Sequence, residues 1–360
     1  MKFIDEYRDG EKARRVLEEI HRQASEPIRL MEVCGTHTVA IARFGLRQVL
    51  PKAIELISGP GCPVCVTANS DLDKAISLAR IPGARLATFG DLMRVPASYS
   101  TLASEKAAGC DVRVVYSPLD GLRMAQENPG HKVIFLGVGF ETTAPTVGAT
   151  LLEAKKLGLK NFWVFSAHKT VPRALKALLD SGEVKINGFL LPGHVSAIIG
   201  SHPYQFLVEE YGQACVISGF EPLDILQSIL MLVRQAKEKE PRLEIQYRRG
   251  VHPEGNLRAL QVMEEVFEAV DAEWRGLGFI KETGLALRPE LAGFDAGRRF
   301  ALPIPPVKEN RACRCGDVLR GSLRPQQCPL FATDCSPKNP VGPCMVSSEG
   351  SCAAAYKYDS

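Results

Sequence analysis

Six cysteines are concentrated in the last 48 residues of this 360-residue chain. Thiolate is the ligand that soft metals and iron–sulfur clusters select. Four thiolates hold a [4Fe–4S] cluster, which leaves two over, whereas two structural zinc sites would need eight ligands. Because five prolines interrupt the segment, we expect an irregular loop stabilised by its metal. The six are Cys313, Cys315, Cys328, Cys335, Cys344 and Cys352.

A second group of cysteines lies near the other end of the chain, in turns rich in Gly, Pro and Thr. Cys62 and Cys65 form a C-x-x-C pair, whose spacing serves either a redox disulfide or metal chelation. Cys34 is predicted to follow a strand directly and to precede a helix. Because a helix dipole lowers the pKa of a thiol at its N-terminus, we expect a thiolate at Cys34 near neutral pH.

These three cysteines and His37 form a Cys₃His set, C-x₂-H followed by C-x₂-C. The set suits tetrahedral zinc, and an iron atom with open positions fits the same thiolates. The residues alone leave both readings open. The remaining histidines in polar turns, His168, His194 and His202, are read as ordinary hydrogen-bonding residues because no metal-ligand spacing accompanies them.

Glu141 belongs to the turn Gly139-Phe-Glu-Thr-Thr143, which follows an apolar run at residues 132–138. Such a turn can hold an anion at the N-terminus of the next helix, and an acidic residue there can equally be a helix-capping charge. Gly137 and Gly139 supply only half of a dinucleotide fingerprint, and no P-loop lysine follows. Nucleotide binding is therefore weakly supported.

The composition and charge of the chain argue against several classes of protein. The formal net charge is +3, from 44 basic and 41 acidic residues, which gives no case for a nucleic acid or a membrane surface as a partner. No apolar run reaches the roughly 18 residues of a membrane span, and the N-terminal residues do not read as a signal peptide. We therefore expect a cytoplasmic protein whose 11 cysteines are metal ligands or redox thiols rather than disulfides.

Apolar strand patterns alternate with helical patterns from residue 28 to residue 237, which predicts an α/β fold. We expect two open parallel-sheet domains with helices on both faces, and a small irregular iron–sulfur domain at the C-terminus. The expected domains are residues 1–125, 126–300 and 301–360, with a Pro-rich linker at 301–312. The expected strands are residues 28–33, 54–57, 85–88, 112–116, 132–138, 162–166, 188–191 and 214–217.

The turns at residues 34–38, 59–65 and 139–143 all follow directly after predicted strands. Open α/β sheets bind ligands at the carboxyl ends of their strands. The three turns are therefore expected to line one cleft.

Jointly, these motifs resemble the HypD family of [NiFe] hydrogenase maturation factors. The resemblance rests on Cys-Gly-Thr-His-Thr from residue 34, Gly-Pro-Gly-Cys-Pro-Val-Cys from 59, Gly-Phe-Glu-Thr-Thr from 139, and the tail sequences Cys-Arg-Cys-Gly and Asn-Pro-Val-Gly-Pro-Cys-Met-Val-Ser-Ser-Glu-Gly. It implies a scaffold for the Fe(CN)₂CO group rather than a conventional enzyme. The implied partners are a small HypC-type chaperone and a HypE-type protein that donates cyanide.

The same resemblance implies roles for individual residues. Cys34, Cys62 and Cys65 take the place of the central cysteines that hold or process the iron. If they do so, we expect His37 and Glu141 to hydrogen-bond the bound cyanide or to carry protons. In the tail, which is similar to ferredoxin–thioredoxin reductase, Cys315 and Cys344 would form a redox pair. Cys110 and Cys215 match no motif and are read as buried structural residues. The implied cluster ligands are Cys313, Cys328, Cys335 and Cys352.

Two other functions fit the residues. One is a thiol–disulfide reductase that uses the cluster to reduce Cys62–Cys65 or a partner's disulfide. The other is a zinc-stabilised interaction protein. Metal and sulfide content would separate zinc from a cluster, and the infrared absorption of bound CN and CO would separate a scaffold from a reductase.

Overall fold

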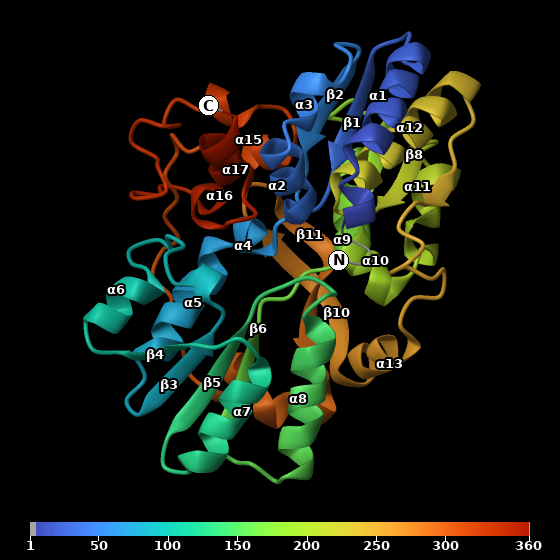
Figure 1. Ribbon diagram of the computed structural model, residues 1–360. Coiled ribbons are helices and arrows are strands. Elements are labelled where there is room, and N and C mark those ends of the chain that lie inside the picture. The colour runs from blue at the N-terminus through green and yellow to red at the C-terminus, as the bar shows by residue number, and fades with distance from the viewer. Residues whose placement is uncertain (1–4, 360) are drawn as a thin grey trace.

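The chain folds around two all-parallel β-sheets, which lie one above the other in Figure 1. The computed structural model describes residues 5–359. In spatial order the first sheet contains β2 (Ile54–Ser58), β1 (Ile28–Glu32), β7 (Gly188–Pro192), β8 (Ala214–Ser218) and β9 (Leu243–Ile245). The second contains β4 (Asp111–Val114), β3 (Ala84–Thr88), β5 (Lys132–Gly137) and β6 (Phe162–Ser166).

Both sheets have helices on both faces, which confirms the predicted α/β class. The first sheet packs its Leu30, Leu190 and Val216 side against α1 (Gly10–Gln23), α2 (Gly35–Arg43), α3 (Leu46–Val49) and α12 (Pro222–Glu238). Its other face meets α10 (Gly193–Ile199) and α11 (Gln205–Glu209). One face of the second sheet is covered by α7 (Pro118–Glu127) and α8 (Ala144–Lys156). Its other face is covered by α5 (Asn69–Ala79), α6 (Leu102–Ala107) and α14 (Ala296–Arg299).

Local sequence explains why these elements form where they do. Five of the six residues of β5 are buried, as expected for an apolar strand covered on both faces. Helix α7 begins at Pro118, and Ser117 and Asp120 form a capping box that satisfies its first free N–H groups. The eight strands predicted from apolar runs are all present, with ends that differ by two residues at most.

The strand pairing does not follow the domain boundary that was expected between residues 125 and 126. Strands β1 and β2 pair with β7 and β8, whereas β3 and β4 pair with β5 and β6. The chain therefore begins the first sheet, builds the whole second sheet, and returns to complete the first. Apolar runs identify strands, but they carry no information on which strands become neighbours.

A β-hairpin and one short strand were not predicted. After α13 (Leu257–Val266), the chain forms β10 (Phe267–Trp274) and β11 (Gly278–Leu287). Burial alternates along β10, so its sequence lacks the apolar run that indicates a strand buried on both faces. Lys169 and Gly284 form an isolated bridge that ties this hairpin to the loop after β6.

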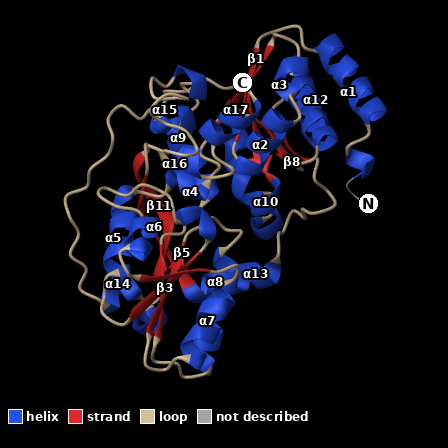
Figure 2. Cartoon of the chain, turned by 60° about the vertical axis from the view of Figure 1, so that its left-hand side comes forward, coloured by secondary structure: helices blue, strands red, loops and turns tan. Residues whose placement is uncertain are grey.

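The cysteine-rich tail packs against both sheets. Residues 301–310, in the expected linker, contain no helix or strand. Helix α16 (Pro343–Val346) contacts α4 (Pro63–Val66), and α17 (Ser351–Tyr358) contacts α2, so the tail lies beside the N-terminal part of the chain (Figures 1 and 2). One apolar core runs from both sheets into the tail, where it includes Cys344 and Met345. The other short helices are α15 (Cys315–Leu319), η1 (Asp5–Tyr7), α9 (Val171–Asp180), η2 (Gly90–Leu92), η3 (His202–Tyr204), η4 (Pro289–Phe294) and η5 (Pro325–Gln327).

Each sheet has one point at which the strand order reverses. In the first sheet β2 and β7 lie on opposite sides of β1, and in the second β4 and β5 lie on opposite sides of β3. Ligand crevices of open α/β sheets form outside the carboxyl ends of the strands at such points. The first reversal places the loop after β1, which holds Cys34, beside the loop after β7. Within residues 5–359, no helix combines the length and apolar character that a membrane crossing requires.

Candidate functional site

Two of the three cysteine-bearing positions begin helices at the carboxyl ends of adjacent strands. Cys34 is the N-cap of α2 after β1, and Cys62 is the N-cap of α4 after β2. Strands β1 and β2 are hydrogen-bonded in register from Ile28 and Ile54 onward, so the two loops leave the sheet side by side. The backbone N–H of Gly35 donates to the carbonyl of Gly61 at 3.0 Å. The sequence prediction that these loops meet is confirmed.

Gly61 is required for this close approach. A Cβ atom added to it would lie 2.2 Å from the Cys34 nitrogen and 2.3 Å from the Val33 carbonyl carbon. Both are backbone atoms, which cannot move away as a flexible side chain can. The two cysteine loops can therefore pack in direct backbone contact only because Gly61 has no side chain.

A cavity of about 340 Å³ opens over Cys34. All three predicted turns contribute to it: Cys34 and Thr36 from the first, Gly61 and Pro63 from the second, and Phe140 and Thr142 from the third. The expectation of one shared cleft is therefore confirmed. Cys62 and Cys65 do not line this cavity, although Gly61 and Pro63, on either side of Cys62 in the chain, do. The other lining residues are Val33, Pro192, His194, Val195, Ile198 and Glu349.

The protonation state of Cys34 differs from the expectation. Burial raises its pKa to about 12, and the negative charge of Glu349 acts in the same direction. Backbone hydrogen bonds from Thr36 and His37, at the start of α2, oppose this shift but are smaller. The prediction of a thiolate near neutral pH was therefore wrong, because desolvation of a buried sulfur outweighs the helix N-terminus. Cys34 is a thiol until a ligand displaces its proton.

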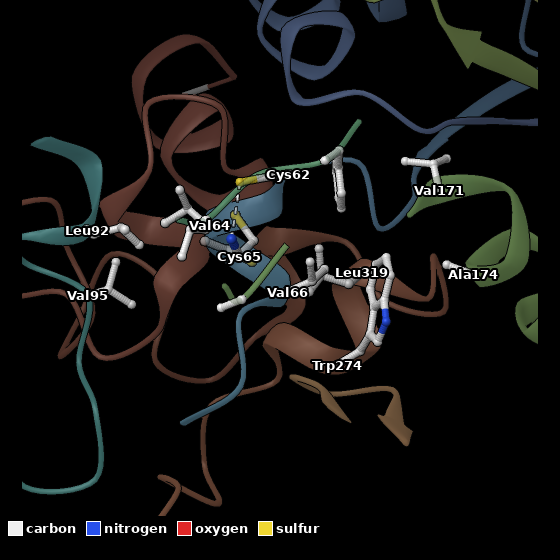
Figure 3. Close-up of a cluster of buried hydrophobic side chains, with 14 of the residues drawn as sticks. Cys62, Val64, Cys65, Val66, Leu92, Val95, Val171, Ala174, Trp274 and Leu319 are labelled. Atoms are coloured by element: carbon white, nitrogen blue, oxygen red, sulfur yellow. Dashed lines mark hydrogen bonds between the residues drawn. The ribbon is translucent and has the colours of Figure 1, made fainter. Parts of the chain in front are cut away.

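Cys62 and Cys65 form a hydrogen-bonded pair inside an apolar cluster. The N–H of Cys65 donates to Cys62 Sγ at 3.3 Å, and Val64, Leu92, Val95, Trp274 and Leu319 surround the pair (Figure 3). Burial raises the pKa of Cys62. At Cys65, burial is outweighed by hydrogen bonds from Cys344 and Cys62, which lower the pKa. Cys65 therefore loses its proton more readily than Cys62 does.

One short segment of the tail touches all of these cysteine positions. Cys344 is hydrogen-bonded to Cys65, and Ser347 Oγ lies 3.4 Å from Cys62 Sγ. Glu349 accepts a hydrogen bond from Thr36 Oγ1 at 2.7 Å, next to Cys34. The tail is therefore part of the candidate site. Glu349 was not identified from the sequence, although its position in the Ser-Ser-Glu-Gly motif after Cys344 was a signal for it.

All six tail cysteines line a single pocket, together with the apolar residues Leu330, Phe331 and Met345. Within it, Cys344 is hydrogen-bonded to Cys315 and to Cys352. Cys344 thus contacts thiols of both the tail and the C-x-x-C pair. A pocket of thiols with apolar neighbours is the donor chemistry that an iron–sulfur cluster needs.

His37 does not complete a metal site with the three cysteines. It is fully buried, its Nε2 atom lies 2.9 Å from the carbonyl of Gly219, and its ring stacks on Phe220. Burial lowers its pKa to about 4, so the ring is neutral. Among residues 5–359, no three His, Cys, Asp or Glu side chains are grouped so as to hold a single metal ion, and this applies to Cys34, Cys62 and Cys65 as well as to His37.

His194, and not His37, is the histidine that lies beside Cys34 in the cavity wall. It lines the cavity over Cys34, and its ring stacks on the other histidine's partner, Phe220, at 3.8 Å between centroids. The sequence reading treated it as an ordinary histidine because no metal-ligand spacing accompanied it. The available signal was its place directly after the predicted strand 188–191, which is the same criterion that identified Cys34.

Glu141 lies just outside the cavity wall. Its Oε1 atom accepts the N–H of Val171 at 3.0 Å, while Oε2 is buried without a hydrogen-bond partner. Burial raises its pKa to about 7. Glu32, which the sequence analysis did not single out, is similar: it is fully buried beneath Cys34, accepts a hydrogen bond from Thr38 Oγ1 at 2.6 Å, and has a pKa raised to about 7 by burial.

Gly61→Ala is expected to destabilise the protein by at least about 2 kcal/mol, because the new Cβ overlaps backbone atoms of the Cys34 loop. Gly130→Ala is the matched control, since no atom lies within 4 Å of its added Cβ. Chemical denaturation of the two variants checks this. Equal unfolding free energies would show that the loops can separate without cost.

Glu141→Gln is expected to stabilise the protein more at pH 8 than at pH 4. Below pH about 4.5 the carboxyl is neutral in the folded and unfolded chains. Between pH about 4.5 and about 7 only the unfolded chain ionises, so wild-type stability falls as the pH rises through this window. The glutamine removes this loss, which amounts to about 3 kcal/mol. Unfolding free energies at both pH values test the prediction, and a pH-independent difference would contradict it.

Comparison with known proteins gives consistent matches over nearly the whole chain. Residues 11–359 match the HypD family, described as the hydrogenase formation hypA family. The hydrogenase maturation factor HypD2 of Bradyrhizobium diazoefficiens is 48% identical, covering 99% of this chain and 97% of its own. HypD of Escherichia coli is 46% identical (99% and 98%), and HypD of Azotobacter vinelandii is 48% identical (99% and 97%).

Proposed function

Because the chain belongs to the HypD family of hydrogenase maturation factors, we propose that it is the scaffold on which an iron ion receives cyanide and carbon monoxide for a [NiFe] hydrogenase. The observation that carries this proposal is Cys34 in the wall of a 340 Å³ cavity at the strand-order reversal, to which the neighbours of Cys62 in the chain, Gly61 and Pro63, also contribute. The iron with its diatomic ligands is the substrate of this site. The protein contributes thiolates, shape and protons.

Cys34 is the thiol that binds the incoming iron. Its raised pKa means that iron binding must release its proton, and a coordinated thiol is deprotonated outright. Thiolates donate strongly to iron, which favours the strong-field ligands cyanide and carbon monoxide. Cys62 and Cys65 complete the site, as the family resemblance implies. His194 faces the same cavity and is placed to donate a hydrogen bond to a bound cyanide, a role that the buried His37 is not placed to fill.

A partner protein can reach the iron because the cavity opens to solvent between the two sheets. A small HypC-type chaperone would supply a further ligand there and carry the finished group away. A HypE-type protein would deliver cyanide to the same opening. The support for both partners is the family and the open cavity, whose rim comes from both sheets and the tail.

The lining of the tail pocket by all six tail cysteines supports the proposal that this segment binds a [4Fe–4S] cluster. Cys313, Cys328, Cys335 and Cys352 would hold it, and when bound the cluster would supply electrons one at a time. Cys315 and Cys344 are left over as a thiol pair. Their proposed redox role is supported by the contacts of Cys344 with Cys315 on one side and with Cys65 on the other. Electrons could thus reach the central cysteines through thiol–disulfide exchange.

The same contact favours a second candidate function, a thiol–disulfide reductase. In that function Cys62 and Cys65 would only cycle between dithiol and disulfide, and neither would bind iron. The two functions differ in whether CN and CO ligands are carried by this chain. Infrared spectra therefore separate them.

Cys34→Ser is expected to abolish the CN and CO infrared bands of protein isolated anaerobically with its partners. Its tail cluster, measured as iron and sulfide content, should remain. Cys110→Ser is the control, because Cys110 is half-buried on the edge of the second sheet, away from the cavity. Single Ser variants of Cys62 and Cys65 extend the test to each residue. Bands that persist unshifted in Cys34→Ser would refute the scaffold function.

Cys335→Ala is expected to remove the cluster, and Cys315→Ala to retain it while blocking hydrogenase maturation. The reason is that only four of the six thiols are needed as ligands. Visible absorption with iron and sulfide analysis checks the first effect, and hydrogenase activity of cells carrying the variant checks the second. Loss of the cluster in Cys315→Ala would show that the ligands are divided differently.

A further inference from the structure

Phe220, in the loop between β8 and α12, contacts both histidines of the site. The His194 ring stacks on the Phe220 ring with 3.8 Å between centroids and 24° between planes. The His37 ring stacks on it with 4.8 Å between centroids and 29° between planes. Tyr247 packs edge-on against the same ring at 5.7 Å. Phe220 therefore links the exposed histidine of the cavity wall to the buried histidine of α2.

Stacking on Phe220 is the contact that orients the His194 ring. Within residues 5–359, neither ring nitrogen of His194 has a hydrogen-bond partner. The His37 ring, in contrast, is also held through Nε2, which donates to the carbonyl of Gly219 at 2.9 Å. Aromatic rings in offset stacking attract one another, so the face of Phe220 favours one orientation of His194 over the others. Both nitrogens of His194 thus remain available to a group bound in the cavity.

The backbone of Phe220 is fixed on both sides by one buried network. The N–H of Gly219 donates to Gln246 Oε1 at 3.1 Å, and the N–H of Glu221 donates to Asp224 Oδ2 at 3.1 Å. Gln246 Nε2 in turn donates to Asp224 Oδ1 at 2.9 Å, and Asp224 is fully buried. The phenylalanine ring is therefore a firm support rather than part of a loose loop.

Gly193 leaves the space that the Phe220 ring needs beside His194. A Cβ atom added to Gly193 would lie 3.2 Å from Phe220 Cζ and 2.5 Å from the Ser218 carbonyl oxygen. The first distance is tight and the second is a clash with backbone. The glycine before His194 thus allows the loop after β8 to approach the loop after β7 closely enough for the two rings to stack.

We propose that Phe220 is a positioning residue: it fixes the His194 ring in the cavity wall, where a ring N–H can donate to the nitrogen of a cyanide bound to the iron. His37 then acts on the site through Phe220 and not as a ligand of the iron. The cyanide contact rests on the proposed function. The placement of His194 by Phe220 does not, because both rings are stacked before iron arrives.

The first test needs no iron and measures how rigid each histidine ring is in the full-length chain. NMR order parameters of the ring C–H groups are recorded with ¹³C-labelled histidine, and His→Gln variants assign the signals of the seven histidines. In the wild type we expect about 0.85, the value of a rigid group, for both His37 and His194. In Phe220→Leu the value for His194 should fall below about 0.6, while His37 keeps its value through its bond to Gly219.

Two further variants make this result specific. Phe220→Met fills the space of the ring without offering a flat face, so it should mobilise His194 as Phe220→Leu does, and it serves if the leucine variant fails to fold. Phe206→Leu is the matched control, because Phe206 is also partly buried but pairs with Tyr211. A rigid His194 in the Phe220 variants, or an equal fall at His37 and His194, would overturn the proposal.

Infrared spectra of the loaded protein separate this inference from the function on which it rests. His194→Ala should shift the CN bands because it removes the donor, and Phe220→Met should shift them in the same direction. Bands that move in His194→Ala but not in Phe220→Met would overturn the positioning role. Unshifted bands in His194→Ala would overturn the cyanide contact alone, and the absence of CN bands from the wild-type protein would count against the proposed function itself.

Discussion

The position of β1 between β2 and β7 is the constraint on which the candidate site depends. Because all three strands are parallel and in register, their carboxyl ends open onto the same edge of the sheet. The Cys34 loop is thereby fixed between the Cys62 loop on one side and the His194 loop on the other. The second sheet adds the Phe140 loop from across the cavity. A strand order without this reversal would separate the cysteine loops from the histidine that faces them.

Burial, rather than any local charge, determines the electrostatics around this edge. Two buried carboxyls and two buried cysteines have pKa values raised by desolvation, and His37 has its pKa lowered by the same cause. All of these shifts favour the neutral form. The exception is Cys65, where hydrogen bonds from neighbouring thiols outweigh desolvation. Apart from the negative charge of Glu349 and the ionisable Cys65, the groups around this edge are therefore neutral before iron arrives, and they can release protons when a cation binds.

Much of this arrangement was predictable from the sequence, and the failures have identifiable causes. Apolar runs located eight strands, and the strand-end rule placed Cys34, Gly61 and Phe140 around one cavity. The same residues could not reveal that β1 pairs with β7, because pairing is decided by contacts between distant segments. His37 was chosen for its sequence proximity to Cys34, and the structure places His194 rather than His37 in the cavity wall. The His37 ring packs against Gly219 and Phe220 in the loop after β8, whereas His194, at the start of α10 directly after β7, lines the cavity.

The interleaved strand order also affects the sequence of events during synthesis. The second sheet uses a continuous stretch of chain, from β3 at Ala84 to β6 at Ser166, and so can fold as soon as it emerges. Strand β1 ends at Glu32 and must wait for β7, which begins at Gly188. At ribosomal rates of about 5–20 residues per second, that wait lasts about 10–30 s. During this time the Cys34 and Cys62 loops lack one wall of their cavity, and the tail that shields Cys62 and Cys65 has yet to be made. The nascent chain therefore exposes these three thiols before it can bury them.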